Sequence, residues 1–71
     1  PIRHKTLSVT VLAKSAALAD GWATAMLVLG KNEGMIVANK LDIPVFFISS
    51  HEKTFITEGS DEFKKIAAGN H

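Results

Sequence analysis

The chain has 71 residues, 46% of them apolar, and a formal net charge of +1 at pH 7; this supports one small domain and excludes a disordered chain. Its scattered Lys and Arg residues form no basic patch, so we expect no nucleic-acid partner. The absence of Cys excludes a disulfide framework, and the longest apolar run, residues 25–29, is far too short to span a membrane.

The first predicted element is a strand at residues 7–13. Apolar and polar side chains alternate there, as in a half-buried strand. One face would carry Leu7, Val9, Val11 and Ala13, and the other Ser8 and Thr10.

A helix at residues 15–29 is predicted next, and the other elements are expected to pack around it. Ser15 can cap its first turn, and Gly30 can end it in a left-handed conformation. Almost every residue between them is apolar, and a helix that is apolar all round is expected to be buried.

The remaining residues predict a shorter helix at 32–41, a hairpin at 45–58 and a terminal helix that begins near residue 60. Ser60 is the expected N-cap of the terminal helix, and Ser50, His51 and Glu52 are the expected hairpin turn, with His51 at the surface. The fold class is therefore α+β, with mixed strands packed on a buried central helix.

Asp20 and Thr24 are the only polar side chains within the central helix, and one helical turn separates them on the same face. A carboxylate in an apolar element needs a partner, and a carboxylate beside a hydroxyl is half of a site for a hard cation such as Mg²⁺. The alternative is a purely local role, in which Thr24 donates to the carbonyl of Asp20.

An N-terminal Pro in a short chain of strands and helices is also a feature of the small tautomerases, in which the amine of Pro1 would act as a base. Arg3 is the only Arg, so the positive charge such sites use for carboxylated substrates is sparse. A structural domain without activity is a further alternative.

Three segments together resemble the ApbE family of Mg²⁺-dependent FAD:protein FMN transferases. They are SVTV at residues 8–11, ADGWATA at 19–25 and VLG at 28–30. The resemblance covers nearly the whole chain and implies that residues 1–71 are the C-terminal segment of a larger, T-fold-related transferase domain.

The resemblance implies that Asp20 and Thr24 are Mg²⁺ ligands beside the pyrophosphate of FAD. Some members carry a second Asp immediately before the Thr, where this chain has Ala23, so water or phosphate oxygens would complete the shell. The implied reaction transfers FMN from FAD to a Thr or Ser hydroxyl of an acceptor protein and releases AMP. Hydrolysis of FAD to FMN and AMP, as in other members, is the alternative.

Several further expectations rest on the resemblance alone. The family's His-Ile-Ile-Asp-Pro segment would stand just before residue 1, so the chain is expected to need the remainder of its enzyme. The other implied partner is an acceptor flavoprotein, and a homodimer is left open. The implied location is the periplasm or cell envelope, with a membrane anchor in the part that precedes this chain.

Overall fold

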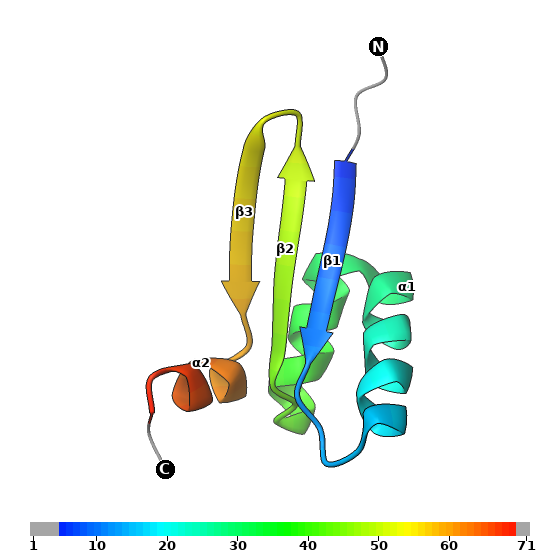
Figure 1. Ribbon diagram of the computed structural model, residues 1–71, viewed down its shortest axis with the longest axis vertical. Coiled ribbons are helices and arrows are strands. Elements are labelled where there is room, and N and C mark those ends of the chain that lie inside the picture. Colours follow the sequence, from blue (N-terminus) through cyan, green and yellow to red (C-terminus); the bar gives the residue numbers. More distant parts are fainter. Residues whose placement is uncertain (1–4, 70–71) are drawn as a thin grey trace.

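The computed structural model describes residues 5–69, which form three strands and two helices in the order β1 (Lys5–Val11), α1 (Ala16–Leu41), β2 (Val45–His51), β3 (Thr54–Gly59) and α2 (Asp61–Ala67). The strands form one sheet in the order β1-β2-β3 (Figure 1). The predicted α+β class is confirmed. Both strand pairings are antiparallel, so the expected mixture of strand directions is wrong.

The first strand lies two residues earlier than predicted, at Lys5–Val11 instead of 7–13. Its pairing with β2 starts where Lys5 faces His51 and ends where Val11 faces Val45. The predicted alternation is confirmed up to Val11, which is buried, whereas Ser8 and Thr10 are exposed.

Helix α1 contains both helices predicted at 15–29 and 32–41, and it folds back on itself at Gly30. Figure 1 shows the two arms, residues 16–29 and 31–41, against the part of the sheet where β1 ends and β2 begins. Gly30 has φ 85° and ψ 171°, a conformation that is essentially restricted to glycine. The predicted break at Gly30 is therefore confirmed with a positive φ, but its ψ is extended and not that of the left-handed helical region. Ser15 also caps the helix as predicted, because its side chain accepts a hydrogen bond from the Leu18 amide at 3.1 Å.

The core lies between the sheet and the two arms of α1. Its fully buried members include Met26 from the first arm, Ala38 from the second and Phe47 from β2. Gly34 permits the close approach of the second arm, since a Cβ there would lie 2.7 Å from Cζ of Phe47. None of the helices in residues 5–69 has the length and apolarity that crossing a membrane requires.

The expectation that the central helix is buried on all sides is wrong for this chain. Of its large apolar side chains, Met26 is buried but Leu18 is 53% exposed and Val28 is 82% exposed. The sheet covers one side of the first arm and the second arm lies beside it, so the outward side has no cover among the described residues.

The hairpin and the terminal helix are confirmed, with a later turn than predicted. β2 continues to His51, which is exposed as expected, and the turn consists of Glu52 and Lys53, with Glu52 at φ 60°. Helix α2 begins after its predicted cap, Ser60, which accepts from the amide of Phe63 at 3.3 Å.

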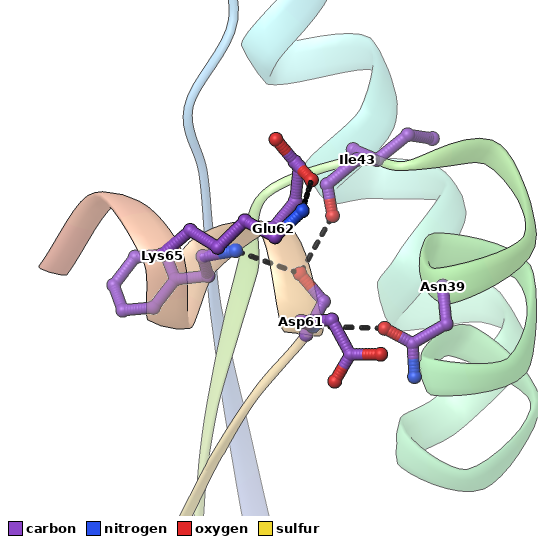
Figure 2. Close-up of polar contacts among 7 residues, drawn as sticks. Asn39, Ile43, Asp61, Glu62 and Lys65 are labelled. Atoms are coloured by element: carbon purple, nitrogen blue, oxygen red, sulfur yellow. Dashed lines mark hydrogen bonds and ion pairs between the residues drawn. The ribbon is translucent and has the colours of Figure 1, made fainter. Parts of the chain in front are cut away.

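Ser60 has a larger role than its predicted capping function, because its side chain is fully buried. The hydroxyl donates to the carbonyl of Ile43 at 2.7 Å and accepts from the amide of Val45 at 2.9 Å. Beside it, the Asp61 amide donates to Oδ1 of Asn39 at 2.9 Å (Figure 2). These bonds connect the end of α1, the start of β2 and the start of α2.

We expect Ser60→Ala to lower the free energy of unfolding by about 2–4 kcal/mol, because it removes a cap and leaves the buried Ile43 carbonyl and Val45 amide without partners. Ser15→Ala is the matched control, since Ser15 is an exposed cap whose loss should cost only about 1 kcal/mol. Denaturant unfolding of both variants measures the difference. Equal losses would contradict the role of Ser60.

Two glycines of α1 provide a second test of the packing. Gly34→Ala should destabilise the protein by about 1–3 kcal/mol, because the new Cβ overlaps the buried Phe47 ring. A Cβ at Gly21 would have no atom within 4 Å, so Gly21→Ala should stabilise the helix by up to about 1 kcal/mol. We expect Gly34→Ala to lower the melting temperature and Gly21→Ala to raise it. A higher melting temperature for Gly34→Ala would contradict the close packing of Gly34 on Phe47.

Candidate metal site

Asp20 and Thr24 lie on the first arm of α1, which begins at the Ser15 cap. The predicted stacking, one turn apart, follows from their helical spacing. Both residues are exposed. The structure therefore places the two side chains side by side, but on the surface of this chain and not inside its core.

Exposure changes the physical basis of the metal hypothesis. A carboxylate buried in an apolar helix needs a partner, because its transfer from water is costly. An exposed carboxylate such as that of Asp20 has no such requirement. Within the part of the chain that the structure describes, no hydrogen bond or ion pair engages the Asp20 carboxylate. The carboxylate is thus available to a ligand.

Thr24 makes the local hydrogen bond that the sequence offered as an alternative, since its Oγ1 donates to the carbonyl of Asp20 at 2.9 Å. This bond uses the proton of the hydroxyl and leaves lone pairs on Oγ1 that can face a cation. The local bond and a metal-ligating role are therefore compatible. Together the two side chains offer two hard oxygen donors, as Mg²⁺ prefers.

The described residues contain no group of three or more His, Cys, Asp or Glu that could hold a metal ion. Mg²⁺ has about six ligands and commonly keeps waters or takes phosphate oxygens. Asp20 and Thr24 therefore fit Mg²⁺ only as a partial ligand set. The remaining ligands would come from water, from a phosphate-containing substrate or from residues outside 5–69.

A shallow hollow of about 300 Å³ lies on the same arm of α1, and neither Asp20 nor Thr24 lines it. It is lined by Ala17, Leu18, Gly21, Trp22 and Ala25. No heavy atom lies within 4 Å of the position of a Cβ at Gly21, so the surface of the arm is open there.

A larger hollow of about 580 Å³ lies elsewhere, against the sheet, and we call it the sheet hollow. It is lined by Thr6, Leu7, Lys31, Ser49, Ser50, His51, Thr54 and Ile56. It includes neither Asp20 nor Thr24. The sequence did not indicate it, because its lining comes from four separate elements.

The residues of the tautomerase alternative, Pro1 and Arg3, lie outside the described residues, as do His4 and His71. The structure therefore brings together Asp20 and Thr24 alone among the predicted site residues.

Residues 1–47 match the sequence model of the ApbE family. The chain is 39% identical to an FAD:protein FMN transferase of Haemophilus influenzae, over 93% of this chain and 19% of that protein. It is 44% identical to an FAD:protein FMN transferase of Vibrio cholerae, over 90% of this chain and 19% of that protein. The chain thus spans about a fifth of the length of the curated relatives it matches.

The fold is similar to that of a solved structure, the apo form of the flavinyl transferase ApbE of Pseudomonas stutzeri. The TM-score is 0.75 and the identity 37%, over 80% of this chain and 18% of that chain. Sequence and structure therefore point to the same family.

The exposure of Asp20 and Thr24 predicts that neither residue carries much of the stability of the fold. Asp20→Asn and Thr24→Val should each change the free energy of unfolding by no more than about 0.5 kcal/mol in metal-free buffer. Thermal unfolding measures this. A large loss in both variants would favour a purely structural role for the pair.

Proposed function

Because this chain belongs to the ApbE family, we propose that it is the C-terminal segment of an FAD:protein FMN transferase, in which Asp20 and Thr24 are ligands of Mg²⁺. The observation that carries the proposal is the pairing of a free carboxylate with a hydroxyl on one helix face, in a chain that is 39% identical to such a transferase over 93% of its length. The resemblance of the ADGWATA segment to the family supports the same two residues.

Asp20 would supply the charged ligand and Thr24 the neutral one. The two side chains project from the same side of α1 because of their helical spacing, and the bond to the Asp20 carbonyl holds the Thr24 hydroxyl there. When bound, Mg²⁺ neutralises the negative charge of phosphate oxygens and orients them. The exposed position of the pair leaves room for the pyrophosphate of FAD and for residues from the rest of the enzyme.

In the proposed reaction, the hydroxyl oxygen of an acceptor Ser or Thr forms a bond to the FMN phosphorus of FAD. The bond from that phosphorus to the bridging oxygen breaks, and AMP leaves with the bridging oxygen. The hydroxyl proton passes to a base that we do not place in this chain. Attack by water at the same phosphorus would instead give FMN and AMP.

The proposal predicts unequal effects of two substitutions in the complete transferase that contains this segment. Asp20→Asn should lower flavin transfer by at least about a hundredfold, because it removes the charged ligand. Thr24→Val should lower it less, because water can replace a neutral ligand. Activity is measured as Mg²⁺ is titrated with FAD and an acceptor protein, and protein-linked flavin is separated from free FMN.

Glu33→Gln is the matched control, since Glu33 is another exposed carboxylate of α1. It should leave the Mg²⁺ dependence unchanged. An Asp20→Asn enzyme with normal turnover and normal Mg²⁺ dependence would refute the metal assignment. Free FMN without protein-linked flavin would favour hydrolysis.

A further inference from the structure

Strand β3 lies at the edge of the sheet and has apolar side chains on both of its faces. It pairs with β2 alone among the described strands. Phe55 is 70% exposed and Ile56 is 53% exposed. Successive side chains point to opposite faces, so each face of β3 presents one large apolar group to solvent.

The other edge of the sheet, strand β1, has the composition of a half-buried strand. Its outward side chains, Thr6, Ser8 and Thr10, are polar and exposed, whereas Val11 on the opposite face is buried. Edge strands in complete proteins are commonly protected by charges, Pro or bulges. The single charge of β3, Glu58, pairs with Lys31 at 3.7 Å, so β3 has little of this protection.

The sheet hollow adjoins the same strand through Thr54 and Ile56 and reaches Ser49 of β2. Figure 1 shows that the arms of α1 lie against the end of the sheet near the start of β2 and that the hairpin end of β2 and β3 extends beyond them. The sheet hollow therefore adjoins the open edge on the face of β3 that carries Ile56.

We propose that the edge of β3 pairs with a further strand from the part of the transferase that this chain does not contain, and that apolar side chains of that part fill the sheet hollow. This inference rests on the proposed function. The relatives are about five times as long as the stretch they share with this chain. In such an enzyme, the other four fifths of the chain are available to pack against these elements.

The position of the candidate metal site argues against the acceptor protein as the occupant of this edge. Helix α1, which carries Asp20 and Thr24, packs mainly on β1, and β3 is at the opposite edge of the sheet. An acceptor also leaves after each turnover, which would expose Phe55 and Ile56 again. A permanent strand of the same enzyme covers them throughout.

Hydrogen exchange of the complete transferase tests the strand pairing. In an antiparallel sheet a residue bonds to a given neighbour only at every second position, so an edge strand leaves about half of its amides free. We expect nearly all amides of residues 55–59 to exchange slowly. Slow exchange of only about half of them would overturn the proposal. Loss of protection on dilution would also overturn it, because a second copy of the protein would then be the occupant.

Substitutions test the sheet hollow separately. In the complete transferase, Ile56→Lys should lower the melting temperature by at least about 5 °C, because it places a charge where an apolar group is buried. Ile56→Thr should give a smaller loss of the same sign. Thr10→Lys, at an exposed position of β1, is the matched control and should have little effect. Equal effects of Ile56→Lys and Thr10→Lys would overturn the proposal.

These measurements do not depend on flavin transfer, which is assayed on the same preparation. An enzyme that transfers FMN but has an open β3 edge refutes the strand pairing alone. An enzyme with a protected β3 edge but no Mg²⁺-dependent flavin transfer refutes the proposed function.

Discussion

The buried hydroxyl of Ser60 joins the α1–β2 connection, the first residue of β2 and the start of α2 through the carbonyl of Ile43 and the amides of Val45 and Phe63. Unpaired backbone groups are costly in an apolar interior, and these segments have no regular ladder to pair them. The backbone adds a further bond, from the Ser60 amide to the Val45 carbonyl at 2.8 Å. This small polar cluster thus joins α2 to the start of β2, and the stacked rings of Phe46 and Phe63 add an apolar contact between the same two elements.

The break at Gly30, where α1 folds back on itself, also determines how the core is packed. It lets two helical arms lie against one end of the three-stranded sheet. The close contact between Gly34 and the Phe47 ring brings the second arm against the sheet. The first arm is anchored by Met26, which is fully buried, and Asp20 and Thr24 then face outward. The candidate metal site is therefore a consequence of how the core is packed on the other side of the helix.

The exposed apolar groups of this chain have a common physical explanation. Val28 on α1 and Phe55 on β3 belong to elements that a longer chain would cover on their outer sides, and the chain spans about a fifth of its curated relatives. A short chain has too few helices and strands to cover every side of an apolar helix, because small domains bury a smaller fraction of their surface than large ones. The apolar composition of residues 15–29 therefore exceeds what the described elements of this chain can bury.

The local features of the fold and the residue types of the candidate site could be predicted from the amino-acid sequence alone. Capping residues, a glycine that can adopt φ 85° and the alternation of Leu7, Val9 and Val11 act over a few residues, so they could be recognised without the fold. The side-by-side placement of Asp20 and Thr24 follows from helical spacing in the same way. The observed boundaries of β1 differ from the predicted ones by two residues, because its pairing with β2 decides where the strand begins and ends.

Which surfaces are buried and which long-range bonds form depends on how the elements pack together, which no local pattern of residues reveals. A run of apolar residues does not reveal how many neighbours are present to cover it, so the exposure of Asp20 could not be predicted from the composition of its helix. The second role of Ser60 depends on Ile43 and Val45, which lie 17 and 15 residues away along the chain. The same holds for the sheet hollow, whose lining residues meet only because the strands pair in one register and α1 turns back at one glycine.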